Sequence, residues 1–98
     1  MPGFLVTVRP SGPKWEPSRP LEQQSDWPAH AAFVDGIVED GFIVLGGPLA
    51  EEHRVMHAVE AESQDAVRAT FARGPWSETH LHLESIEPGT LRLDRRCR

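Results

Sequence analysis

The segment that decides the fold is residues 27–49, which read W-P-A-H-A-A-F-V-D-G-I-V-E-D-G-F-I-V-L-G-G-P-L. In its first half, apolar residues recur at the three- and four-residue spacing of an amphipathic helix. Pro28 is tolerated only in the first turn of a helix, which fixes the start close by. The sequence therefore predicts a helix that is capped by Ser25 or Asp26 and runs to Asp40.

One side of this predicted helix carries an ionisable residue within an apolar stripe. The stripe consists of Trp27, His30, Ala31, Val34, Ile37 and Val38. Because the stripe faces a sheet, the imidazole of His30 is either a core group bonded to a backbone carbonyl or an acid–base catalyst. The residue pattern alone leaves both alternatives open.

Short apolar segments on either side of the helix are predicted to be strands. Residues 42–45 follow Gly41, which is suited to a left-handed C-cap, and we expect a strand that is buried on both sides and ended by residues 46–48. Residues 4–8 are β-branched and apolar, as in a central strand. Residues 10–20 hold four prolines and one glycine, which predicts a loop able to cover or line a site.

The second half of the chain continues the alternation of strand and helix. Residues 54–60 and 79–87 alternate between apolar and other residues and are predicted strands. The first of these follows a polar hairpin turn at residues 50–53. A short helix is predicted over residues 63–71, with its first residue as N-cap. Residues 90–93 are expected to extend the last strand.

The predicted order, β-α-β-β-α-β, is that of the ferredoxin-like fold, an α+β class with a four-stranded antiparallel sheet. Two helices cover only one face of such a sheet. The other face keeps apolar groups, so we expect a second subunit to cover it and predict a homodimer packed through the sheet faces.

Length and composition restrict the class of protein. The 98 residues fit one domain, 1–98, with a formal net charge of −5 that argues against nucleic acid as a partner. No apolar segment is long enough to span a bilayer or act as a signal peptide. The lone Cys97 excludes an internal disulfide, so we expect a cytoplasmic protein without membrane contact. Residues 94–98 are expected to be a flexible basic tail.

Four motifs together resemble the YCII-related (YciI-like) family. They are W-x-x-H-A-x-F-V-D at 27–35, G-F-I-V-L-G-G-P-L at 41–49, V-E-A-E-S at 59–63 and G-P-W at 74–76. The resemblance covers nearly the whole chain. It implies the dimeric α/β-barrel form of the ferredoxin-like fold.

The resemblance also implies a small enzyme. A relative in the family acts as a dehydrochlorinase on a hydroxylated chloro-aromatic ring, and the wider superfamily includes muconolactone isomerases and monooxygenases. The family's site pairs a histidine, matched here by His30, with the aspartate of an Asp-Pro pair after the second helix. This chain departs from that pattern because Gly74 precedes Pro75. The expected acid–base pair therefore lacks its carboxylate.

Four further residues are candidates for binding a substrate. Arg9 ends the first strand and either clamps an anionic group or pairs with a nearby acid on the surface. Trp15 and Trp76 lie in predicted loops, where indoles line a pocket or a dimer contact, whereas Trp27 is expected in the core. Pro48, at the end of the second strand, completes the predicted substrate-binding set.

The other histidines raise the alternative of a metal site. His80 and His82 are expected on one strand face, with His57 about 10 Å away across an intervening strand. No third ligand is obviously placed, so solvated or interface histidines are the preferred interpretation. We expect neither a metal nor a cofactor.

Two hypotheses for the function follow. The first is a cofactor-independent lyase or isomerase that acts on a small hydroxylated or enol-like metabolite, aromatic ones included, with His30 as general acid/base. The second is a non-catalytic ligand-binding or accessory protein that kept the fold but lost the acid–base pair.

Overall fold

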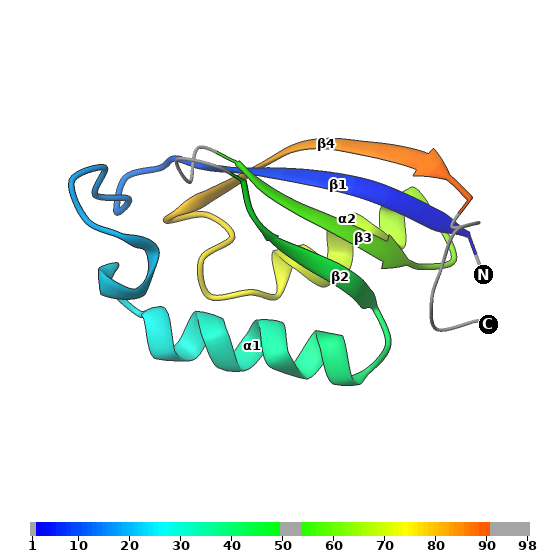
Figure 1. Cartoon of the computed structure of the whole chain (residues 1–98), viewed down its shortest axis with the longest axis horizontal. Coiled ribbons are helices and arrows are strands. Elements are labelled where there is room, and N and C mark those ends of the chain that lie inside the picture. Colours follow the sequence, from blue (N-terminus) through cyan, green and yellow to red (C-terminus); the bar gives the residue numbers. More distant parts are fainter. Residues whose placement is uncertain (1, 50–53, 91–98) are drawn as a thin grey trace.

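The computed structural model describes residues 2–49 and 54–90 as an α+β arrangement of one four-stranded antiparallel sheet and two α-helices (Figure 1). In chain order the elements are β1 (Gly3–Pro10), the 3₁₀ helix η1 (Leu21–Gln23), α1 (Trp27–Glu39), β2 (Ile43–Pro48), β3 (Val55–Glu60), α2 (Gln64–Ala72) and β4 (Leu81–Gly89). The strands lie side by side in the order β2-β3-β1-β4, and each neighbouring pair is antiparallel. This order is compatible with the predicted ferredoxin-like fold.

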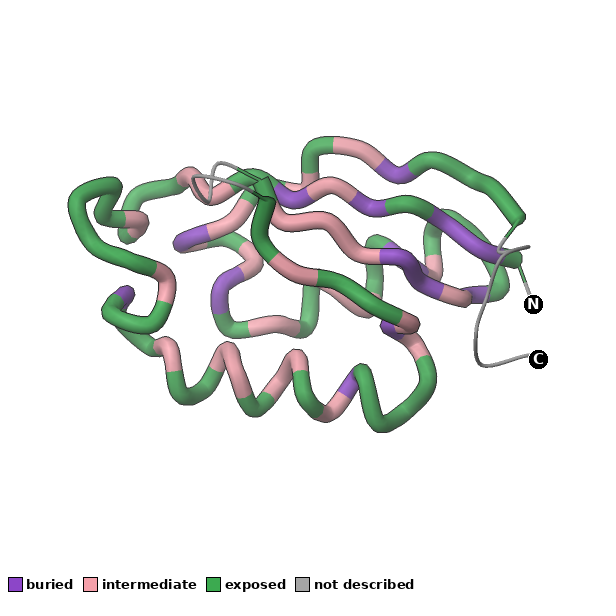
Figure 2. Tube along the Cα trace, in the orientation of Figure 1, coloured by how far each residue is buried: buried purple, intermediate pink, exposed green. Residues whose placement is uncertain are grey.

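The core lies between one face of the sheet and both helices. On the central strand β1, Phe4, Val6 and Val8 are buried, whereas the intervening Leu5 is 38% exposed (Figure 2). Ile37 of α1 and Val67 of α2 belong to the same buried cluster as these strand residues. Since neighbouring side chains on a strand point to opposite faces, the helices cover one face and leave the other face open.

The helix α1 begins and ends where the sequence predicts, although its N-cap residue does not cap it through a side-chain hydrogen bond. Asp26 occupies the N-cap position with φ 61°, and among the described residues its side chain makes no capping hydrogen bond. At the other end, Gly41 has φ 84°, and the amides of Gly41 and Phe42 donate to the carbonyl oxygens of Val38 and Ile37. This pair of bonds is a Schellman motif, which requires the left-handed conformation that glycine adopts without strain.

The second strand differs from its prediction. β2 runs through residues 46–48 instead of ending before them, and it is an edge strand instead of a strand buried on both sides. Ile43 is buried but Leu45 is 61% exposed, and the register with β3 shifts between these two residues. The apolar run therefore predicted the strand correctly, but it did not show that the strand lies at the edge of the sheet, with only one neighbouring strand in the described part of the chain.

The remaining elements agree with the predictions within about two residues, the usual scatter at element ends. Ser63 caps α2, because its hydroxyl accepts a hydrogen bond from the Ala66 amide over 3.1 Å. β4 begins at Leu81, later than predicted. The predicted hairpin turn at residues 50–53, most of the predicted strand extension at 90–93 and the predicted basic tail fall outside the described residues. Neither α1 nor α2 is long and apolar enough to cross a membrane.

Candidate functional site

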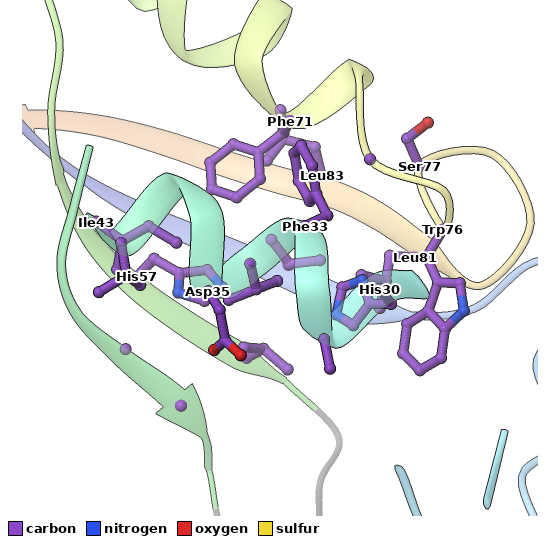
Figure 3. A pocket seen from close by; sticks show the side chains of 18 of the residues that line it. His30, Phe33, Asp35, Ile43, His57, Phe71, Trp76, Ser77, Leu81 and Leu83 are labelled. Carbon is purple, nitrogen blue, oxygen red and sulfur yellow. The ribbon is translucent and has the colours of Figure 1, made fainter. Parts of the chain in front are cut away.

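A cavity of about 780 Å³ lies between α1, the helix-covered face of the sheet and the segment that follows α2 (Figure 3). Its lining is mainly aliphatic and aromatic, with Phe33 and Val34 from α1 and Leu81 and Leu83 from β4. A volume of roughly 300–1,000 Å³ with an apolar wall and few polar groups is typical of sites for small molecules. The polar groups on this wall therefore indicate what the cavity can bind.

The indole of Trp76 forms one end of the cavity and holds the neighbouring rings in place. It is 1% exposed and stacks on His30, with ring centroids 4.0 Å apart and planes 7° from parallel. It also stacks on His80 at 4.6 Å and 18°. Its Nε1 donates to the Ser25 carbonyl oxygen over 2.9 Å, which ties it to the start of α1.

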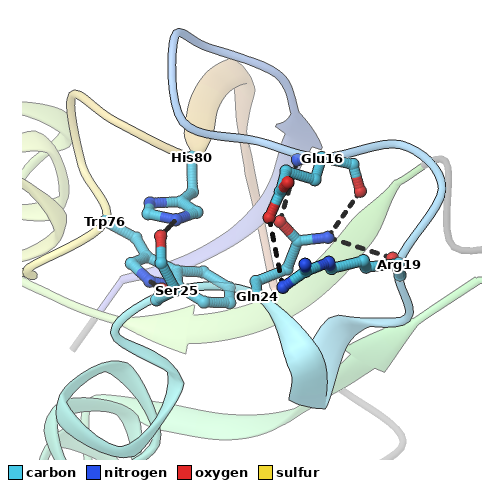
Figure 4. A network of polar contacts seen from close by, with 6 residues as sticks. All are labelled: Glu16, Arg19, Gln24, Ser25, Trp76 and His80. Carbon is cyan, nitrogen blue, oxygen red and sulfur yellow. Dashed lines mark hydrogen bonds and ion pairs between the residues drawn. The ribbon is translucent and has the colours of Figure 1, made fainter.

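His80 is fully buried behind this wall, and its hydrogen bonds are satisfied by protein groups. Its Nε2 bonds the hydroxyl of Ser25 at 2.9 Å (Figure 4). Its Nδ1 bonds the hydroxyl of Thr79 at 2.7 Å. Burial lowers the pKa of His80, so the ring is neutral at pH 7. The prediction that His80 and His82 share a strand face is wrong, because His80 precedes β4 whereas His82 is exposed on it.

The proline-rich loop also packs behind the Trp76 wall. Lys14 donates its amide hydrogen to the Thr79 carbonyl oxygen over 2.9 Å, and Trp15 meets Trp76 edge to face at 6.3 Å. Gln24 fixes the loop from inside, since its amide group bonds the backbone of Glu16 in both directions (Figure 4). The loop therefore supports the cavity wall from its outer side.

His30, the general acid/base candidate from the sequence, lines the cavity from α1. Its ring is half-buried, and its Nδ1 is buried without a hydrogen-bond partner in the described part of the chain. Burial, with smaller contributions from His57 and His80, lowers the pKa of His30 to about 4. The imidazole is therefore uncharged at pH 7, and Nε2 is the nitrogen left for a ligand to contact.

His57 on β3 is a second imidazole at the same cavity, and its place corrects the sequence-based interpretation of a solvated or interface histidine. It is paired with Val6 in the sheet register and so faces the helices. Burial lowers the pKa of His57 to about 4. Its Nδ1 is also buried with no partner among residues 2–49 and 54–90.

Two of the predicted substrate-binding residues meet His30 at the cavity, and two do not. Pro48 and Trp76 line it, whereas Trp15 reaches it only through Trp76. Arg9 follows the buried Val8 on β1 and is exposed, so alternation directs its side chain to the open face of the sheet. Arg9 is therefore not among the residues that line this cavity, and its role as an anion clamp stays a prediction.

The position of Gly74 is filled by a neighbouring ring. A Cβ atom added at Gly74 would lie 2.9 Å from Cε2 of Phe33, so any larger residue requires that ring to shift. Two carboxylates, those of Asp35 and Glu78, belong to residues that line the cavity, and both residues are exposed. Within the described ranges, no three His, Cys, Asp or Glu side chains gather closely enough to hold a metal ion.

The arrangement brings two uncharged imidazoles to one apolar cavity, where each can accept or donate a proton or a hydrogen bond. Comparison of the chain with protein-family models, with curated proteins and with solved structures finds no match. The chemistry of the site therefore follows from its own geometry.

The two depressed pKa values predict that acid destabilises the fold. Between the ordinary pKa of 6.5 and the folded value of about 4, His30 and His57 bind protons in the unfolded chain but not in the folded one. The contribution of the two uncharged rings to the free energy of unfolding should therefore be present in full above pH 6.5 and should decrease as the pH falls towards 4. We expect a loss of about 3 kcal/mol from the two rings together, after allowance for solvent screening.

Urea denaturation at a series of pH values measures this loss, with His57→Phe as the matched variant. The variant lacks one of the two titrating rings, so its free energy of unfolding should depend less steeply on pH over this window. Equal slopes for the wild type and the variant would show that His57 is not desolvated in the folded protein.

Proposed function

We propose that this protein is a small cytoplasmic enzyme related to the YCII-related proteins, a cofactor-independent lyase or isomerase. It moves a proton on a small hydroxylated or enol-like metabolite, aromatic ones included, with His30 as the general acid/base. The observation that carries this proposal is the uncharged ring of His30 at the wall of an apolar cavity, whose Nδ1 has no hydrogen-bond partner among the described residues.

Three features of the cavity support such a substrate. The rings of Phe33 and Phe71, which are only partly buried on the cavity wall, suit a planar ligand. The charged residues of the lining, Asp35, Arg68 and Glu78, are exposed, and the rest of the wall is uncharged. The buried part of the cavity therefore favours a molecule that is uncharged when it binds, since burial of an unpaired charge is costly. The lowered pKa of His30 keeps its ring in the form that accepts a proton at pH 7.

A second candidate is a ligand-binding protein without catalysis. No carboxylate among the described residues is hydrogen-bonded to His30, and general bases are most effective when their pKa lies near the working pH. A pKa of about 4 makes the free imidazole a weak base. The Phe33 ring, which fills the space beside Gly74, also favours this candidate because it occupies the place of the missing aspartate.

The conversion of α-angelica lactone to its β isomer separates the two candidates. This reaction moves a proton from the carbon next to the carbonyl to the methyl-bearing ring carbon. His30→Ala should slow the enzymatic rate by about 10²-fold or more, the usual contribution of general acid–base catalysis. Quenching of tryptophan fluorescence measures lactone binding in the same samples.

His82→Ala is the matched control, because His82 is exposed on β4, and it should leave the rate within about two-fold of the wild type. A wild-type protein that binds the lactone without converting it supports the second candidate. Conversion at the wild-type rate by His30→Ala contradicts the proposed role of His30.

We also propose that two copies of the protein form a homodimer, in which the open faces of the two sheets pack together into an α/β barrel. Leu5, 38% exposed on the central strand, lies at the middle of the open face, with Ala58 and Glu87 as its partners in the sheet register. Apolar side chains on a sheet face are stabilised when a second sheet covers them. The resemblance to the YCII-related family supports the same assembly.

Replacement of Leu5 by lysine should convert the dimer into monomers, because it introduces a charge into the buried interface. Ala69→Lys, at an exposed position on α2, is the control and should leave the mass unchanged. Sedimentation equilibrium measures both masses, and a wild-type mass of one chain contradicts the dimer.

A further inference from the structure

The imidazole of His57 is not explained by the needs of the fold. It lies in β3 between Val55 and Val59, which share its face of the sheet, and 5.7 Å from the ring of Phe71. Its Nδ1 finds no hydrogen-bond partner in residues 2–49 and 54–90. A buried polar atom without a partner costs stability, and an apolar side chain at this place would avoid that cost. The histidine therefore indicates a function.

The neighbouring edge strand is shaped to receive this ring. Gly46 of β2 is paired with His57, and a Cβ atom added to Gly46 would overlap Nδ1 of that ring. The same Cβ would lie 2.8 Å from the Met56 carbonyl oxygen. Gly46 does not have a positive φ, so its backbone conformation does not require glycine. Glycine is needed here because a side chain would not fit beside His57.

This close approach decides which nitrogen of His57 carries the proton. The hydrogen of Gly46 that replaces a Cβ points towards Nδ1. A proton on Nδ1 would collide with that hydrogen, whereas a lone pair on Nδ1 accepts a weak C–H contact. The neutral ring therefore holds its proton on Nε2, and Nε2–H is a hydrogen-bond donor available to a ligand.

We propose that His57 is a second catalytic residue of the cavity, whose Nε2–H donates a hydrogen bond to a carbonyl oxygen of the substrate. The inference rests on the proposed function and narrows its substrate class to enolisable carbonyl compounds, such as lactones and cyclic ketones. Gly46 is the positioning residue that fixes the ring and its tautomer.

In the proposed reaction His30 transfers the proton and His57 stabilises the oxygen, so that protons and electrons balance. His30 takes the proton from the carbon next to the carbonyl, and the electron pair of that C–H bond moves through the new C=C bond onto the carbonyl oxygen. The enolate oxygen accepts the hydrogen bond from His57, which keeps its proton throughout. His30 then returns the proton to a second carbon, which completes an isomerisation. Burial keeps the His57 ring uncharged at pH 7, so the donor is a neutral imidazole.

Variants of His57 and Gly46 test this assignment in the α-angelica lactone assay. His57→Phe keeps a ring but loses the donor, and we expect a loss in rate of about 10²-fold or more. His57→Gln restores an N–H donor near the Nε2 position and should recover at least a tenth of the wild-type rate. A structural role alone would not be restored by glutamine. Gly46→Ala should displace the ring and lower the rate as His57→Phe does.

Gly47→Ala is the control, since a Cβ atom at Gly47 meets nothing within 4 Å in the described structure. It should keep the wild-type rate. Nitrogen-15 spectra of histidine-labelled protein without ligand provide a second readout, in which His57 should appear as the Nε2–H tautomer and lose this form in Gly46→Ala.

Three results would overturn the proposal: an Nδ1–H tautomer at His57, wild-type binding and rate in His57→Phe, or a wild-type protein that does not bind the lactone. The experiments distinguish an error in the role of His57 from an error in the proposed enzymatic function. If His30→Ala stops conversion and His57→Phe does not, only the role of His57 is wrong. If the wild type binds the lactone through His57 but does not convert it, the carbonyl contact stands as a binding contact and the enzymatic role fails.

Discussion

The stacking of His30 on the indole of Trp76 is the contact on which the rest of the site depends. Trp76 is anchored by its hydrogen bond to the carbonyl oxygen of Ser25, the residue before the N-cap of α1. The same indole stacks on His80 and packs against Trp15, so it joins the helix, the segment before β4 and the proline-rich loop. Because these parts of the chain meet at one buried ring, the imidazole of His30 has a fixed place at the cavity wall.

Desolvation gives the two imidazoles of the cavity their chemical character. His30 and His57 are held where an uncharged ring is favoured over a charged one, and neither Nδ1 is bonded by the described protein groups. His80, which is also buried, has both nitrogens bonded to hydroxyls. This contrast separates a structural histidine from two that are left available to a ligand, and it supports the proposal of a proton-transfer or ligand-binding site.

Local sequence signals predicted most of the fold. Pro28, the apolar stripe and Gly41 locate α1 because they depend on backbone geometry within one element. The edge position of β2 was not predicted, since it depends on pairing between distant strands. The cavity positions of His30 and Trp76 agree with the sequence-based hypothesis, and their roles stay predictions.

The position of His57 at the cavity was not predicted from the sequence, because both faces of its strand carry apolar residues. Val55 and Val59 share its face, but Met56 and Ala58 make the opposite face of β3 apolar as well. Alternation along this strand therefore does not show which face is buried. Gly46 could be understood only from the irregular register between β2 and β3, which no local pattern encodes.

The central claim is that His30 and His57 are desolvated, uncharged imidazoles at one apolar cavity. A pH titration of the histidine ring resonances by nuclear magnetic resonance, assigned with the His30→Ala and His57→Phe variants, measures this most directly. The structure predicts that both rings stay neutral through pH 6 and titrate with a pKa of about 4. Titration of either ring at its ordinary pKa of 6.5 would contradict the claim.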